Sequence, residues 1–226
     1  MNHYQQRVIL GLSLWILTLV WAIFFPGASH HQTETLVNSL IQAFSNPTQV
    51  NAYLFVHFCL MGVWPWIILA YWLGETPFRG SLWAKLVVFL LSNVVGAFIM
   101  LPYEALRSSE AKRLPPRWLF RLGLSRWFAF FLLAVSTLLL LYAVVEGGFR
   151  EYLELLNESN FVRIMLVDFF LFHVIAIRLI WRDIRDKDSN YHPAQLTVFF
   201  TPLLGPLFFL LFRKQLEAAH PAMIRY

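Results

Sequence analysis

Residues 127–145 read WFAFFLLAVSTLLLLYAVV, a run of 19 residues without a charged side chain. About 20 apolar residues in a helix are needed to cross the roughly 30 Å of hydrocarbon in a bilayer. The run lacks the alternation of apolar and polar residues that a transmembrane strand requires. It therefore predicts a membrane-spanning helix.

The composition of the whole chain also indicates a membrane protein. Of the 226 residues, 58% are hydrophobic and 14% are charged, and the mean hydropathy is +0.58. A soluble domain has about 45–50% apolar and about 25% charged residues. A soluble chain of this length could not bury so large an apolar surface. Membrane lipid is therefore the first partner that we expect.

Five further stretches are long and apolar enough to cross a bilayer. They are residues 8–25, 52–73, 84–103, 161–181 and 195–212. Because lipid offers the backbone no hydrogen-bond partner, each stretch is expected to be a helix. The predicted fold class is therefore all-α, a polytopic membrane protein with about six transmembrane helices.

Aromatic and amphipathic segments are expected to mark the membrane surfaces. Residues 33–45 and 149–157 each place their apolar side chains on one helical face, which is typical of helices that lie in the interface. Tryptophans are enriched at the same depth. The tryptophans that flank the predicted spans are Trp83, Trp118, Trp127 and Trp181.

The order of features repeats along the chain. A shift of about 109 residues pairs Asn51 with Asn160, Trp72 with Trp181 and Gly96 with Gly205. We expect one three-helix repeat over residues 1–105, a basic linker over 106–126 and a second three-helix repeat over 127–226. With three crossings each, the repeats would be inverted relative to one another, and their functional site would lie near the membrane midplane. Residues 74–83 and 106–126 would then lie on opposite sides of the membrane.

The predicted fifth span carries three polar candidates for catalysis, Asp168, His173 and Arg178. Ionisable groups within a span are costly and are functional candidates for that reason. Five-residue steps rotate by about 140° around a helix, so Asp168 and His173 should contact different neighbouring helices. The first hypothesis makes them acid–base or orienting groups for a bound ligand. The alternatives are ordinary hydrogen bonds between helices and a proton path.

The second span carries three candidates for ligand binding, His57, Trp64 and Trp66. Pro65 is expected to kink the helix between the two tryptophans, whose large flat side chains could line a groove for a polyene or a ring. A neutral imidazole at His57 could hold the central magnesium of a chlorophyll. The alternatives are a packed histidine and an ordinary kinked helix.

Other kinds of site have little support in the sequence. With Cys59 as the one cysteine, and with His30 and His31 lacking a third ligand at metal-binding spacing, no metal site is predicted. The net charge of +5 comes from basic residues in short loops, which set topology and meet lipid headgroups, so no nucleic-acid partner is expected. Glu104, with Arg107 and Arg113 nearby, is predicted to form an interfacial ion pair.

Two parts of the chain resemble known membrane proteins. Residues 168–183 (DFFLFHVIAIRLIWRD) and 203–207 (LLGPL) resemble the neoxanthin-synthase-like membrane proteins of plastids and bacteria. In that family the first two polar positions of the helix are His and then Asp, and here they are Asp168 and then His173. The segments 51–55 (NAYLF), 61–65 (MGVWP) and 101–103 (LPY) resemble uncharacterised membrane proteins of cyanobacteria and plastids.

These resemblances imply a photosynthetic source and a link to carotenoids. The expected location is a cyanobacterial thylakoid or plasma membrane, or a plastid membrane. The first hypothesis is a protein that binds or isomerises a carotenoid. The second is a non-enzymatic subunit or assembly factor of photosynthetic complexes, holding a carotenoid or chlorophyll and contacting other subunits. The third is a small transporter.

Overall fold

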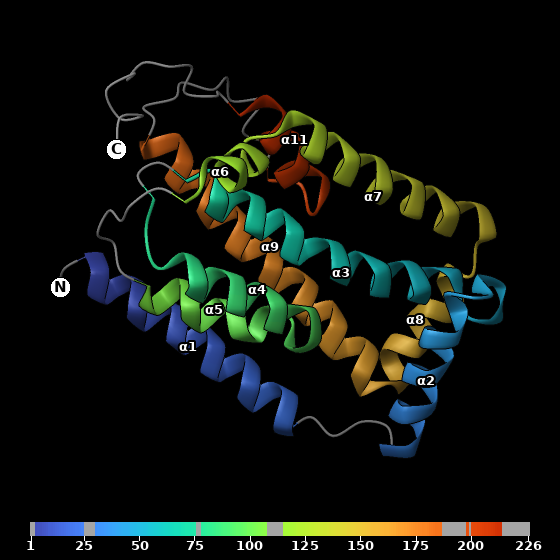
Figure 1. The fold of residues 1–226 in the computed structure, drawn as a ribbon. Coiled ribbons are helices and arrows are strands. Elements are labelled where there is room, and N and C mark those ends of the chain that lie inside the picture. Colours follow the sequence, from blue (N-terminus) through green and yellow to red (C-terminus); the bar gives the residue numbers. More distant parts are fainter. Residues whose placement is uncertain are drawn as a thin grey trace.

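The computed structural model describes residues 3–24, 30–75, 78–107, 115–186, 198 and 200–213. The fold is all-α, as the sequence predicts (Figure 1). The described helices are α1 (His3–Phe24), α2 (His30–Ala43), α3 (Ala52–Leu73), α4 (Leu82–Val95), α5 (Ala97–Leu106), α6 (Arg117–Gly123), α7 (Arg126–Glu146), α8 (Phe149–Glu158), α9 (Asn160–Asp186) and α11 (Leu204–Phe212). A short 3-10 helix, η1, spans Pro47–Gln49.

Within the described residues, three helices are long and apolar enough to cross a membrane, namely α3, α7 and α9. Shorter apolar helices are residues 8–21 of α1, together with α4 and α5. Helix α3 packs against both α7 and α9 and is the centre of the bundle. The chain is therefore built as a membrane protein, with three of the six predicted spans meeting this criterion of length.

The predicted third span is two helices that fold back on each other. Helix α4 ends at Gly96, where φ is 72° and ψ is −151°, and α5 starts at the next residue. Lys85 and Arg107 would be about 33 Å apart in one straight helix, yet both contact Glu75, at 3.2 and 2.9 Å. Helices α4 and α5 thus form a re-entrant hairpin whose two ends lie at the same end of the bundle.

Asp168 stabilises the tip of this hairpin. The first N–H groups of a helix have no partner within the helix, and the N–H of Ala97 donates to Asp168 Oδ1 over 2.7 Å. The break requires glycine because this backbone conformation is open almost only to glycine. A Cβ on Gly96 would also overlap the Asp168 carboxylate.

The last predicted span is also short in its described part. Residues 195–197 and 199 lie outside the described residues, and α11 covers nine residues, about 14 Å. It begins near the middle of α9, where Phe200 contacts His173, and ends at Arg213, which contacts Asp183. Helix α11 therefore runs toward the same end of the bundle as α5.

The repeated order of elements is present, but the two halves are not inverted. Helices α3 and α9 both end at the cluster of charges around Glu75, and α5 and α11 both run toward it. Inverted halves would place these ends on opposite sides. The expectation of an inverted 3+3 repeat was wrong because the third span of the first half turns back at Gly96 instead of crossing.

Both halves contribute to a single core. Its buried side chains come from α3, α5, α7, α9 and α11, and the most deeply buried ones include Trp64, Trp72 and Phe172. The segment 106–126 was predicted as a linker, and its residues 108–114 lie outside the described part. The boundaries of the two repeats remain predictions.

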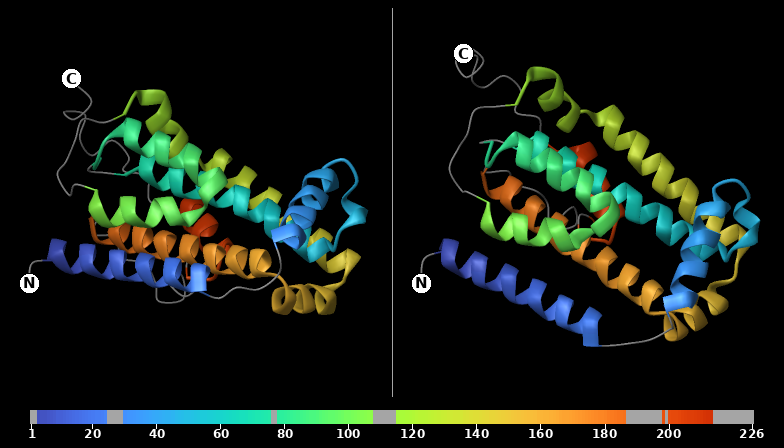
Figure 2. Two further views of the ribbon diagram at one scale, coloured as in Figure 1. Left: turned by 90° about the horizontal axis from the view of Figure 1, so that it is seen from below. Right: turned by 60° about the horizontal axis from the view of Figure 1, so that its bottom comes forward.

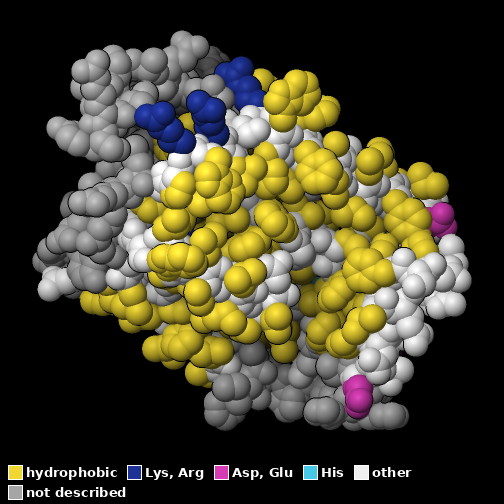
Figure 3. Space-filling model, viewed as in Figure 1, with side chains coloured by type: hydrophobic (Ala, Val, Ile, Leu, Met, Phe, Trp, Pro, Cys, Tyr) yellow, Lys and Arg dark blue, Asp and Glu magenta, His cyan; other side chains and the backbone are white. Residues whose placement is uncertain are grey.

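The two ends of the bundle differ in chemistry. Helices α2 and α8 lie at one end and α6 at the other (Figure 1). In Figure 3 hydrophobic side chains cover the middle of the visible face, between basic residues near α6 and acidic residues at the opposite end. The four tryptophans predicted at an interface are all more than half exposed and lie toward the α6 end.

Replacing Gly96 by alanine should destabilise the protein by about 2 kcal/mol or more, because the new Cβ meets both a glycine-only backbone and the Asp168 carboxylate. Gly62→Ala is the matched control, since nothing lies near a Cβ at that exposed helical position. It should be neutral or slightly stabilising. Thermal unfolding in detergent measures both variants, and equal unfolding midpoints would contradict the role given to Gly96.

Candidate functional site

A buried cluster of charges joins four helices at the α6 end, and Glu75 is its centre. Both terminal nitrogens of Arg107 donate to the Glu75 carboxylate over 2.9 Å, and Arg182 approaches it to 2.9 Å. Lys85 lies 3.2 Å and Arg79 3.5 Å from it. Because these cations come from α4, α9 and the residues after α3 and α5, Glu75 connects the ends of all four helices.

Glu104 is the second carboxylate of this cluster and is fully buried. Its Oε1 accepts a hydrogen bond from the indole N–H of Trp72 over 2.6 Å and lies 3.0 Å from Arg107 Nε. Its Oε2 lies 3.6 Å from Arg182 and accepts no hydrogen bond from the described residues. The predicted pairing of Glu104 with Arg107 is confirmed, but in the protein interior. Arg113 lies outside the described residues.

Among the described residues, the members of this cluster carry one positive charge in excess. Arg79, Lys85, Arg107 and Arg182 face Glu75, Glu104 and Asp186, the last of which pairs with Arg79 over 2.6 Å. Burial alone would lower the pKa of Arg107, but Glu104 and Glu75 outweigh it and raise that pKa above its ordinary value. Buried charges are tolerated only when each has partners, and Glu104 has two, Arg107 at Oε1 and Arg182 at Oε2.

A second ion pair repeats the first one in the other half of the chain. Arg213, directly after α11, donates from Nε and Nη2 to the two oxygens of Asp183 over 2.9 and 2.5 Å. Arg107, directly after α5, binds Glu75 in the same two-pronged way. Arg213 also donates to the carbonyl of Gly74. The ends of α5 and α11 are thus each joined to the end of a long helix, α3 or α9, by a bidentate arginine–carboxylate ion pair.

A cavity of about 400 Å³ lies next to Glu104, between α1, α5 and α9. Its wall is mostly aliphatic, and its polar members are Glu104 and Arg178. The lining residues are Leu10, Gly11, Leu14, Leu101, Glu104, Val174, Ile175 and Arg178. Leu10 and Val174 are 71% and 45% exposed on the outside of the bundle, so the cavity opens toward the lipid.

The cavity exists because α1 and α7 pack differently. Helix α7 begins the second half and packs against both α3 and α11. Helix α1 has the corresponding place in the first half but packs mainly against α5, and it lies at the edge of the bundle in both views of Figure 2. The indole of Trp15 donates to the carbonyl of Phe98, which lacks its helical partner because Pro102 has no N–H. Because α1 is held against α5, space remains between α1 and α9.

Asp168 and His173 lie apart from this cavity and contact different neighbours, as their spacing predicts. Asp168 accepts the N–H of Ala97 at the hairpin tip, and Nε2 of His173 lies 3.1 Å from the carbonyl of Phe200. Arg178 lines the cavity with Glu104. No described contact links these three candidates to one another, so the structure does not assemble them into one catalytic site.

Of the three ligand-binding candidates on α3, His57 and Trp64 both face Phe169 on α9, whereas Trp66 points elsewhere. The hydroxyl of Tyr152 lies 2.9 Å from Nδ1 of His57, and the Phe169 ring stands edge-on to the imidazole at 5.7 Å. Trp64 is fully buried and stacks on Phe172, with 6.0 Å between ring centres. Trp66 is 41% exposed and packs against Phe89 at 4.7 Å. The two indoles therefore do not line a common groove.

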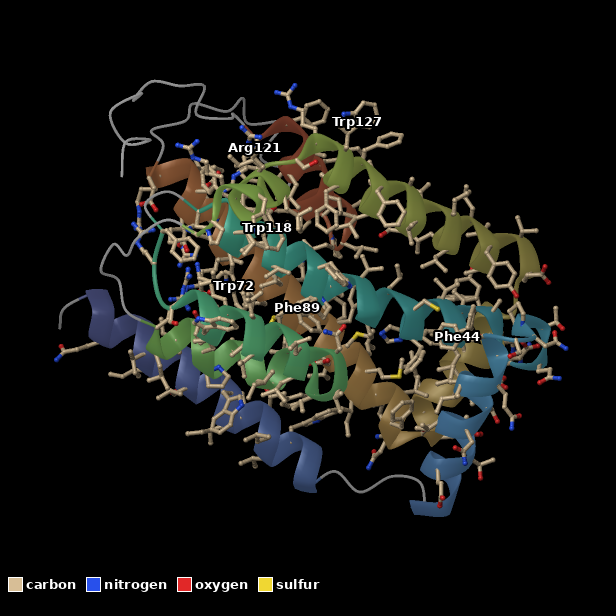
Figure 4. All side chains as sticks on the ribbon, in the orientation of Figure 1. Phe44, Trp72, Phe89, Trp118, Arg121 and Trp127 are labelled. Carbon is tan, nitrogen blue, oxygen red and sulfur yellow. The ribbon has the colours of Figure 1, made fainter. Side chains whose placement is uncertain are left out.

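The main members of the charge cluster were not singled out from the sequence. Glu75 follows α3, a 22-residue helix without a charge, and it stands four residues before Arg79 in a connection that looks like an ordinary loop. Arg182 looks like a flanking basic residue. The sequence signal that could have located the cluster is the pair Trp72 and Glu104. An indole N–H donor and a carboxylate lie near the ends of two apolar stretches. Figure 4 shows Trp72 in the part of the bundle toward α6.

No family model matches the chain, and neither a curated protein nor a solved structure matches it. The resemblance to neoxanthin-synthase-like proteins therefore stays a prediction. Within the described residues, no group of three or more histidine, cysteine, aspartate or glutamate side chains is placed to hold a metal ion.

Glu75→Gln should destabilise the protein by about 3 kcal/mol or more, because it leaves several buried cations without their shared counter-charge. Glu154→Gln is the control, since Glu154 pairs with Arg150 at 3.5 Å on the exposed surface of α8. Its effect should stay within about 0.5 kcal/mol. Thermal unfolding of both variants in one detergent makes the comparison, and a stable Glu75→Gln protein would contradict the central role of Glu75.

Proposed function

We propose that the protein is an integral membrane protein that binds a carotenoid in the cavity between α1, α5 and α9. The observation that carries this proposal is a mostly aliphatic cavity, open to lipid, whose lining residues include Glu104 and Arg178. Binding sites for small molecules are mainly apolar, with a few polar groups that fix orientation. A long hydrocarbon with a polar end group has the same distribution of chemistry.

The size and opening of the cavity suit one end of such a ligand. Sites for small molecules have volumes of about 300–1,000 Å³, and this cavity has about 400 Å³. One ring and part of a polyene chain would occupy it. The rest of the chain would leave past Val174 and Leu10 and lie in the surrounding lipid.

Binding is better supported than isomerisation. Asp168 has a structural partner at the tip of the α4–α5 hairpin, and His173 lies against the Phe200 carbonyl. A general acid or base must reach the ligand directly or through one water, and neither residue lines the cavity. Chlorophyll is less well supported, because Tyr152 and Phe169 pack around the imidazole of His57.

The re-entrant hairpin also bears on orientation. It places Arg79, Lys85, Arg107, Arg182 and Arg213 at one end, together with the exposed residues of α6 and the start of α7. Arg150 and Arg163 are the basic residues described near the α8 end. Basic residues are enriched on the cytoplasmic side of membrane proteins. We infer that the α6 end faces the cytoplasm or stroma of a photosynthetic membrane, the location that the resemblance implies.

Val174→Trp should reduce the carotenoid that co-purifies with the protein by at least about half, because the indole would fill the opening of the cavity. Val144→Trp is the matched control, since Val144 is exposed on α7, outside the cavity. Pigment is extracted from each protein after purification from carotenoid-producing cells and quantified by absorbance. Equal pigment in both variants, or none in the parent protein, would refute the proposed site.

Asp168→Asn and His173→Gln should leave the ratio of carotenoid isomers in the cells unchanged, because neither side chain reaches the cavity. Asp168→Asn should instead lower stability by about 1–2 kcal/mol, since it weakens a charge-assisted bond to the start of α5. Chromatography of cell extracts measures the isomers. A change in their ratio with either variant would support isomerisation.

A further inference from the structure

We propose that α6 and the first turn of α7 form a binding surface for the headgroup of an anionic phospholipid. We call it the arginine surface, and its residues are Arg117, Trp118, Arg121, Arg126 and Trp127. None of these residues lines the cavity between α1, α5 and α9. The inference therefore goes beyond the proposed function and does not depend on the carotenoid.

The arginine surface concentrates positive charge in a segment that has no acidic residue. Between Glu110 and Glu146 the sequence contains five basic residues and no aspartate or glutamate. The three arginines of the surface are all exposed, whereas Arg107 and Arg213 are buried against carboxylates. Basic side chains gathered near α6 are visible in Figure 3. The arginine surface therefore presents its charge to groups outside the protein.

Helix α6 is packed tightly enough to hold two of these arginines in a fixed arrangement. Leu119 lies in a buried cluster with residues of α3 and α4, and a Cβ on Gly123 would overlap the backbone of Gly74. Leu119 and Gly123 are four residues apart and share the buried face of the helix. Arg117 and Arg121 have the same spacing on the opposite face, with Cβ atoms about 5–6 Å apart.

This spacing favours a phosphate between the two side chains. Like charges one helical turn apart repel each other, and a shared anion removes the repulsion. A guanidinium group can donate two parallel hydrogen bonds to a phosphate, which a single ammonium group cannot match. Arg126, the first residue of α7, adds a third guanidinium beside the end of α6.

The two tryptophans indicate that the phosphate belongs to a lipid. Trp118 is 68% and Trp127 is 83% exposed, and exposed indoles concentrate at the interface between membrane and water. The uncharged run 127–145 begins directly after Arg126, which places the arginines at the depth of the headgroups. Figure 4 shows Arg121 and Trp127 at the corner where α6 meets α7. An acidic protein would pair with the arginines but would give the indoles no apolar surroundings, so a lipid fits better.

The experiment measures lipid binding to the full chain in a neutral detergent, with bound lipid detected by native mass spectrometry. Phosphatidylglycerol is the anionic probe, and phosphatidylcholine with the same acyl chains is the neutral one. The parent protein should bind phosphatidylglycerol at least about tenfold more tightly, since each arginine near anionic lipid contributes roughly fivefold. Arg121→Gln and Arg126→Gln should each lower the affinity for phosphatidylglycerol about fivefold and leave that for phosphatidylcholine unchanged.

Arg150→Gln is the matched control, because it removes the same charge from an exposed side chain of α8 at the other end of the bundle. It should bind both lipids as the parent protein does. The substitutions all lie at exposed positions, so the three variants should fold like the parent.

Three results would overturn the inference. The first is equal affinity of the parent protein for the two lipids. The second is an Arg150→Gln variant that loses as much affinity as Arg121→Gln, because net charge would then explain the preference. The third is a polyglutamate peptide that binds the parent protein more tightly than phosphatidylglycerol and is weakened by Arg121→Gln, because the surface would then belong to an acidic protein.

Discussion

The ion pairs around Glu75 are the interaction on which the rest of this structure depends. One carboxylate is shared by Lys85, Arg107 and Arg182, which come from the start of α4, the end of α5 and the end of α9. Removing one member of such a buried group is far more costly than removing a surface pair, because the remaining charges lose their compensation. The cluster holds the two ends of the α4–α5 hairpin together and fixes them to both long helices.

The tip of the hairpin is fixed as well, by Asp168 on α9. With both its tip and its base attached to the bundle, the hairpin presents α5 as a rigid wall to α1. Helix α1 packs on α5 and leaves space on its side toward α9. In the second half, α7 packs against both α3 and α11. The cavity thus lies beside α1. Glu104 belongs to the charge cluster and is also among the residues that line the cavity.

Several features of the chain followed from its sequence for simple physical reasons. Long apolar stretches with few or no charges identified the helices α3, α7 and α9, because lipid leaves the backbone no alternative to a helix. The five-residue spacing of Asp168 and His173 correctly separated their contacts. The pairing of Glu104 with Arg107 followed from their separation of three residues, which places them on one face of a helix. These are local relations, and neighbouring residues determine them.

The direction of the third span, the parallel relation of the halves and the cavity were decided by tertiary structure. An apolar stretch of 20 residues has the same composition whether it crosses the membrane or turns back. A single glycine within it is not enough to predict a turn. The reversal at Gly96 depends on an aspartate 72 positions later, and the closing of its ends depends on Glu75 accepting cations from three segments. The sequence determined which segments are helices, since that is set by solvent and local chemistry. Only the folded chain decided which polar groups meet, since that is set by packing between distant segments.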